Sequence, residues 1–104
     1  VMSIDTMNYA KVNYLELDAT YSEGICVGKD NKIYVCNSGN TDDTQAGEGT
    51  TISVLPLTLD DETQITVPKN PKLIAAYSAN KMYFNVLGDV CTLHCTNSIQ
   101  LHPM

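Results

Sequence analysis

The sequence is poor in aromatic and basic residues. Of its 104 residues none is Trp, one is Phe and six are Tyr. Lys and Arg together number six against twelve Asp and Glu, which gives a formal net charge of −6. Nucleic acids and anionic membrane surfaces are both bound through clustered Lys and Arg. The composition therefore argues against both as partners.

Several sequence signals for membrane insertion, export and catalysis are also missing. No apolar run approaches the ~20 residues of a membrane-spanning helix, and neither a signal peptide nor an Asn-x-Ser/Thr sequon is recognisable. The sequence has no Gly-x-Ser-x-Gly, phosphate-binding loop or His-Glu-x-x-His motif. Asp60 and Asp61 fall in a predicted turn, where we expect them to be solvated. We therefore predict no membrane span, no enzymatic activity and no cofactor.

Helical periodicity is absent as well. Short alternating or apolar runs, bounded by turn residues, recur along the chain and are typical of strands. Ten strands are predicted, over residues 2–5, 12–17, 24–28, 32–37, 51–55, 64–67, 73–77, 81–86, 90–94 and 98–101. The turn Lys29-Asp30-Asn31 predicts a hairpin, because Asp and Asn tolerate the left-handed conformation of tight turns. The fold class is therefore predicted to be all-β and antiparallel.

What the sequence does contain is an internal repeat. Asn31-Lys32-Ile33-Tyr34-Val35 returns as Asn80-Lys81-Met82-Tyr83-Phe84 forty-nine residues later, and two segments return fifty residues later: Met2-Ser3-Ile4 as Ile52-Ser53-Val54, and Leu15-Glu16-Leu17 as Ile65-Thr66-Val67. Four antiparallel strands per unit at this period indicate the blades of a β-propeller. We predict a half blade over 1–17, a full blade over 18–67 and a second blade over 68–104.

The ordered elements resemble the YVTN or YncE-like β-propeller repeat, which reads TVSVID, then TI.VG..P, then GKIYVTN. Thr51-Ile52-Ser53-Val54 is similar to the first element, the run 65–71 to the second, and Asn80-Lys81-Met82-Tyr83-Phe84 to the third. Residues 31–37 also resemble the third element, with Cys in place of Thr, and Ser3-Ile4-Asp5-Thr6 resembles the IDT of the first. The likeness covers most of residues 1–86.

The resemblance implies a non-catalytic, exported protein, similar to Bacteroidetes-type secreted, cell-surface or periplasmic propellers, lipoproteins among them. It implies binding of a small ligand such as a corrinoid, siderophore or other metal chelate, or of a partner such as an outer-membrane transporter. Two alternatives stay open. In the first, the chain is a fragment of a propeller enzyme, a lactonase-like hydrolase with its catalytic residues elsewhere. In the second, it is a purely structural interaction module.

Propellers close with about 4–8 blades, so two and a half blades predict an incomplete propeller with open sheet edges. Because the sequence begins inside a blade, at Val1-Met2, a fragment is favoured over an assembly of several copies. The expected partners are therefore the remaining blades or another copy.

The loop 38–49 is acidic and rich in glycine, and alternating strand direction places it on the same face as the connections 18–23, 68–72 and 87–89. A solvated loop is favoured over a calcium site there, because the spacing of an EF-hand is absent. The predicted ligand-binding residues on this face are Tyr21, Glu23, Asn37, Asp42, Asp43, Lys69 and Asn70.

The four cysteines allow disulfides, thiols or a metal site. A turn centred on Asn31 would place Cys26 opposite Cys36 for a cross-strand bridge, but thiols are favoured. Near the carboxyl end, Cys91, His94, Cys95 and His102 are of zinc-ligating types. Strand alternation separates His94 from the two cysteines, so no metal site is predicted.

Overall fold

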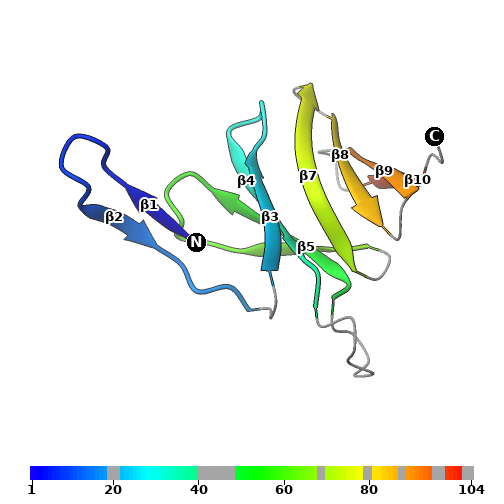
Figure 1. Ribbon diagram of the computed structural model, residues 1–104, viewed down its shortest axis with the longest axis horizontal. Helices are drawn as coiled ribbons and strands as arrows, with labels where there is room; N and C mark the ends of the chain where they lie inside the picture. Colours follow the sequence, from blue (N-terminus) through cyan, green and yellow to red (C-terminus); the bar gives the residue numbers. More distant parts are fainter. Residues whose placement is uncertain are drawn as a thin grey trace.

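The protein consists of short β-strands, with no helix among the residues that the structure describes. The computed structural model describes residues 1–18, 22–39, 49–67, 70–78, 81–86, 89–94 and 98–101. Ten strands follow one another (Figure 1): β1 (Met2–Ile4), β2 (Lys11–Tyr14), β3 (Ser22–Val27), β4 (Lys32–Asn37), β5 (Thr51–Pro56), β6 (Thr63–Thr66), β7 (Pro71–Ser78), β8 (Lys81–Val86), β9 (Asp89–His94) and β10 (Ser98–Leu101). Over these ranges, no helix is long and apolar enough to span a membrane.

The strands form three antiparallel sheets, each made of strands that are consecutive in the chain. Their orders are β1-β2, β3-β4-β5-β6 and β7-β8-β9-β10. The prediction of an all-β, antiparallel chain is confirmed. Every predicted strand is present, but β2 ends at Tyr14 rather than at Leu17. Leu15 and Leu17 leave the strand and instead pack in a hydrophobic cluster with Val35 and Leu55.

The hairpin between β3 and β4 turns at Lys29-Asp30-Asn31, as predicted. The backbone N–H of Asn31 donates to the carbonyl of Gly28 at 3.0 Å, and Asn31 takes a φ of 62°. A three-residue hairpin loop needs one such left-handed residue, and Asn adopts that conformation more readily than most. The Asp30 carboxylate accepts a hydrogen bond of 2.6 Å from the Tyr34 hydroxyl. The turn is thereby fixed to the strand that follows it.

The two four-stranded sheets repeat in strand register as well as in sequence. Pairs in the first hairpin of one sheet recur forty-nine residues later in the other: Cys26↔Tyr34 with Ala75↔Tyr83, Val27↔Ile33 with Ala76↔Met82, and Ser22↔Asn37 with Pro71↔Val86. Both hairpins also contain a register shift just after their first pairs. The sequence repeat is therefore a repeat of backbone geometry.

The main hydrophobic core lies between the two four-stranded sheets. We call the face of β3–β6 that packs against β7–β10 the C-side face; it carries Cys26, Tyr34, Cys36, Ile52, Val54 and Ile65. The opposite face, called the N-side face, carries Ile25, Val27, Ile33, Val35, Asn37, Ser53 and Leu55. Sheet β7–β10 contributes Ile74, Met82, Phe84, Val86, Cys91 and Leu93 to this core. Each large apolar side chain buried here contributes about 1.5–3 kcal/mol.

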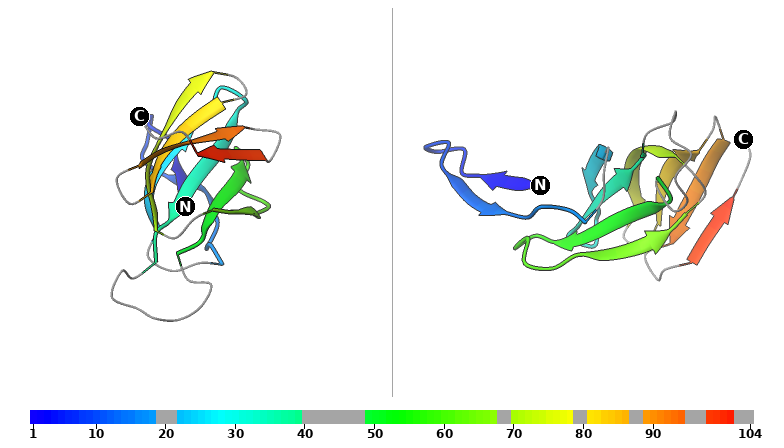
Figure 2. Two further views of the ribbon diagram at one scale, coloured as in Figure 1. Left: turned by 90° about the vertical axis from the view of Figure 1, so that its right-hand side faces the viewer. Right: turned by 90° about the horizontal axis from the view of Figure 1, so that it is seen from below.

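The molecule measures 42 × 32 × 19 Å along its three principal axes. The three sheets follow one another along the longest of these axes (Figure 2). The β1–β2 hairpin lies at one end, β7–β10 lies at the other, and β3–β6 lies between them. Val1, Leu15 and Leu17 pack against Val35 and Leu55 on the N-side face. The β1–β2 hairpin itself projects away from β3–β6 (Figures 1 and 2).

Candidate functional site

Three of the predicted ligand-binding residues lie in the described part of the chain, and all three are near one end of β3–β6. Glu23 lies near the start of β3, Asn37 ends β4, and Asn70 directly precedes β7. The remaining predicted residues lie outside the described residues: Tyr21, Asp42, Asp43 and Lys69. The structure therefore brings Glu23, Asn37 and Asn70 to a common end of the two sheets, as alternating strand direction predicts.

Glu23 is the most accessible of the three. Its carboxylate lies 3.7 Å from the Lys72 ammonium, with the two side chains 60% and 44% exposed. An ion pair this exposed contributes little to stability. Both charges are therefore available to a ligand or partner at this end of the sheets.

Asn37 is buried in a hydrogen-bond network on the N-side face. Its Nδ2 donates to Thr51 Oγ1 at 2.9 Å and to Ser53 Oγ at 2.8 Å. Its Oδ1 accepts from the Ser22 hydroxyl at 2.8 Å. The network joins β3, β4 and β5 across the sheet. Because the Asn37 side chain is 1% exposed, it positions these strands, and its contact with a ligand stays a prediction.

Asn70 holds together the two described ends of the loop 38–49. Its side chain donates a 2.5 Å hydrogen bond to the Ser38 carbonyl, and its backbone N–H donates to the Gly49 carbonyl at 2.6 Å. The Ser38 hydroxyl donates to the Pro71 carbonyl at 2.5 Å. Asn70 and Gly49 both have positive φ, 63° and 70°. The acidic loop therefore starts and ends on a rigid base, although Asn70 itself is 9% exposed.

Glu62 extends the polar network towards the N-terminal segment, and sequence reasoning missed it. Its carboxylate accepts hydrogen bonds from Ser53 Oγ at 2.5 Å, from the Asp18 backbone N–H at 2.9 Å and from Gln64 Nε2 at 3.2 Å. Gln64 Nε2 also donates to the Asp18 carbonyl at 3.0 Å. The available signal in the sequence was the polar Ser53 between the apolar residues Ile52 and Val54. These bonds fix the segment that enters β3–β6 to its last strand.

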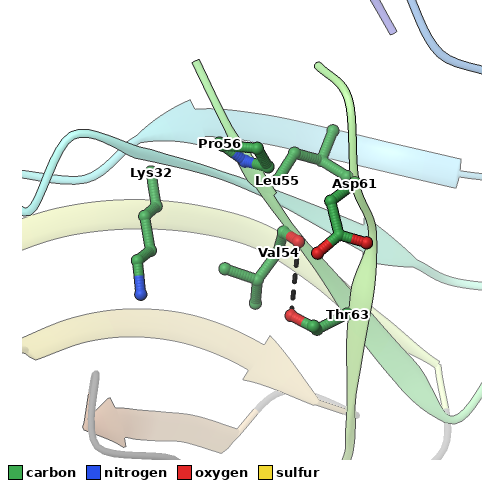
Figure 3. A pocket seen from close by; sticks show the side chains of 6 residues that line it. All are labelled: Lys32, Val54, Leu55, Pro56, Asp61 and Thr63. Atoms are coloured by element: carbon green, nitrogen blue, oxygen red, sulfur yellow. Dashed lines mark hydrogen bonds between the residues drawn. The ribbon is translucent and has the colours of Figure 1, made fainter. Parts of the chain in front are cut away.

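The structure also contains an open hollow of about 220 Å³ that the sequence did not indicate. Figure 3 shows the Lys32 ammonium on one side of Val54 and the Asp61 carboxylate on the other. The lining residues are Lys32, Val54, Leu55, Pro56, Asp61 and Thr63. Lys32 pairs with Pro56 at the end of β4–β5 opposite to Asn37. The hollow therefore lies away from the predicted ligand-binding residues.

Cys26, Cys36 and Cys91 are thiols in the structure, as favoured. The turn centres the pairing on Asp30, so Cys26 lies opposite Tyr34 and only diagonal to Cys36. The alternative of a directly opposed Cys26–Cys36 bridge is therefore wrong. Burial, and to a smaller extent the neighbouring Cys26, raise the pKa of the Cys36 thiol to about 12. Such a thiol is a poor nucleophile and a poor metal ligand at neutral pH.

The possible zinc ligands near the carboxyl end are largely beyond what the structure describes. Cys95, His102 and the side chain of His94 lie outside the described residues, while Cys91 is fully buried. In the described ranges, no three His, Cys, Asp or Glu side chains are grouped to hold a metal ion. Asp60 and Asp61 are exposed, as expected for carboxylates in a turn.

Protein-family models, curated proteins and solved structures were compared with the chain, and none matches it.

Proposed function

We propose that this chain is a segment of a β-propeller and acts as a non-catalytic scaffold that binds a small ligand or a partner protein. One observation carries the proposal. Two successive four-stranded antiparallel sheets share three residue pairs of their first hairpin at an offset of forty-nine residues. They pack face to face, and the N-terminal segment packs on the first sheet in the same order. Successive blades of a propeller are related in this way.

The binding face in this proposal is the end of the sheets that carries Glu23, Asn37 and Asn70. Ligand-binding loops work best when a rigid scaffold positions them. Asn37 fixes the strands below this face, and Asn70 fixes the base of the loop 38–49. Glu23 and Lys72 supply one accessible charge of each sign. The ligand class proposed from the family resemblance is a corrinoid, a siderophore or another metal chelate.

The proposed setting is an exported protein, either periplasmic or at the cell surface, which delivers its ligand to a partner such as an outer-membrane transporter. The sheets of the described residues do not close into a ring. The remaining blades are therefore proposed as structural partners. The binding face would be shared between these residues and the other blades.

Electron microscopy of the natural polypeptide tests the architecture, because a closed ring of four-stranded blades is expected.

Titration with cyanocobalamin and with ferrioxamine, followed by fluorescence or calorimetry, tests the ligand class. An Asp42→Ala, Asp43→Ala variant should weaken binding, whereas Asp60→Ala, in an exposed turn after β5, should leave it unchanged. Metal-dependent lactone hydrolysis by the natural polypeptide would instead support the enzyme alternative and overturn the proposal.

A further inference from the structure

Two apolar residues on the N-side face lack the cover that their repeat equivalents have. Ile25 and Val27 of β3 are 57% and 55% exposed. Forty-nine residues later, Ile74 is 8% exposed, and Ala76 packs against the same core. Three residue pairs of the two hairpins correspond at this offset, and two of them involve the residues that directly follow Ile25 and Ile74 in the chain. The difference therefore comes from what lies on the face and not from the strands themselves.

The cover of Ile74 identifies what is missing over Ile25. Ile74 belongs to the core cluster that includes Tyr34 and Cys36 of β4, with Cys26 of β3 packed against it. These residues lie on the first two strands of the preceding unit. By the repeat, Ile25 requires the first two strands of the unit that comes before β3–β6.

The β1–β2 sheet shows the same deficiency from its own side. Met2 and Ile4 of β1 correspond by the repeat to Ile52 and Val54 of β5. β5 is paired on both sides, by β4 and β6, whereas among the described residues β1 is paired with β2 alone. Met2 and Ile4 are 50% and 48% exposed, while Ile52 is fully buried. The open edge of β1 is therefore the position that β4 takes beside β5.

We propose that Ile25, Val27 and the open edge of β1 together bind one antiparallel β-hairpin of this chain's own repeat type. Its second strand adds to the edge of β1, as an extended peptide adds to an exposed sheet edge. Its apolar face, built like that of Cys26 and Tyr34, covers Ile25 and Val27. This surface is continuous with the cluster of Val35, Leu15 and Leu17. The proposal deepens the proposed function and rests on it.

The source of the hairpin is the first half of the repeat unit whose second half is β1–β2, and not a second copy of this chain. In a second copy, β3–β4 is already covered on its C-side face by β7–β10. The other candidate hairpin, β7–β8, continues into β9–β10, which is paired with it. If β7–β8 of a second copy docked on Ile25 and Val27 in the order of the repeat, its β9–β10 would occupy the position that Leu15 and Leu17 already fill. A lone hairpin meets no such obstacle.

The 104-residue protein with a synthetic hairpin tests the proposal. The peptide has the sequence of residues 22–37 with Cys26→Ala and Cys36→Asn, the residues found forty-nine positions later. Calorimetry should show saturable binding, and a peptide of scrambled sequence should not bind. An Ile25→Ser, Val27→Ser protein should bind about tenfold more weakly or worse, because the anchor contacts are lost. Leu57→Ser is the matched control, because Leu57 is similarly exposed, at 49%, but lies outside the proposed binding surface.

Amide hydrogen exchange on the unsubstituted protein gives a second measurement that does not depend on any variant. Peptide binding should slow exchange at Met2 and Ile4, whose N–H groups face the open edge of β1 because Val1 and Asp5 on either side face β2. The absence of binding, or equal binding by the Ile25→Ser, Val27→Ser protein, would overturn the proposal. The proposal would also be overturned if the protein self-associates without peptide and the Ile25→Ser, Val27→Ser substitutions abolish this self-association. The occupant of the surface would then be a second copy of the chain. A natural polypeptide that forms no ring would defeat the proposed function alone, because the peptide result is obtained independently.

Discussion

The hydroxyl of Ser53 donates a hydrogen bond of 2.5 Å to the carboxylate of Glu62. Burial raises the pKa of Glu62, but the hydrogen bonds from Ser53, Asp18 and Gln64 and the positive N-terminus of Val1 outweigh burial. The net effect holds the pKa below its usual value of 4.5. The folded state therefore prefers the charged carboxylate, and this preference stabilises the protein only when the group is ionised.

Replacement of Glu62 by Gln should make stability less sensitive to acid. Since the folded pKa is lowered, the stabilisation is complete well above pH 4.5 and is lost as the pH falls through the folded pKa. We expect Glu62→Gln to lower the free energy of unfolding by about 1 kcal/mol at pH 7. Urea unfolding at pH 7 and pH 3 should show the difference from the unsubstituted protein shrinking in acid. Glu16→Gln, at an exposed carboxylate, is the control, and a difference that stays constant with pH would contradict the assignment.

Loss of the Asn37 amide should destabilise the sheet. Asn37→Ala leaves Ser53, Ser22 and Thr51 without the hydrogen bonds that join β3, β4 and β5. Unsatisfied buried groups cost about 1–3 kcal/mol each, so we expect a loss of about 2–3 kcal/mol in urea unfolding. Thr51→Ala removes a single, half-buried partner and should cost less. Equal losses for the two variants would show that the network is not centred on Asn37.

The repeat supplies a matched pair for measuring the packing between sheets. Ile74 and Ile25 are equivalent in the sequence repeat and directly precede equivalent residue pairs, Ala75↔Tyr83 and Cys26↔Tyr34, but they are 8% and 57% exposed. Ile74→Ala should lower the free energy of unfolding by about 2–4 kcal/mol, and Ile25→Ala by less than about 1 kcal/mol. Thermal or urea unfolding measures both. A similar large loss at the two positions would mean that Ile25 is buried in solution.

The buried thiol of Cys36 should resist alkylation in the folded protein. It is fully buried, and burial raises its pKa to about 12, so the thiolate is scarce at pH 8. Iodoacetamide at pH 8, followed by peptide mass spectrometry, should label Cys36 only after denaturation. Half-buried Cys26 should react faster in the folded protein. A Cys26–Cys36 disulfide in a non-reducing peptide map would contradict the register observed here.

Much of the strand architecture follows from the local sequence. Alternation places Tyr34 and Cys36 on one face of β4 and Val35 on the other. The turn at Lys29-Asp30-Asn31 was predictable, because few residues tolerate the left-handed conformation that Asn31 adopts. The end of β2 at Tyr14 was not, since Leu15 has the same strand pattern as the residues before it.

The candidate site was harder to predict than the strands. Only the topology brought Glu23, Asn37 and Asn70 to one end of the sheets, because alternate connections between antiparallel strands lie at the same end of a sheet. Nothing local distinguished the accessible Glu23 from the buried Asn37. Hydrogen-bond partners such as Ser53 lie sixteen residues from Asn37, and only folding brings them within reach.

The sequence by itself determined the repeat, the strand faces and the position of the β3–β4 turn, because these depend on side-chain alternation and turn chemistry within a few residues. Only the tertiary structure decided which of two equivalent residues is buried. Ile25 and Ile74 lie on equivalent strand faces. Ile74 is covered by the neighbouring sheet β3–β6, whereas Ile25 is exposed. Burial depends on the surface that arrives from elsewhere in the fold, and no local pattern encodes that surface.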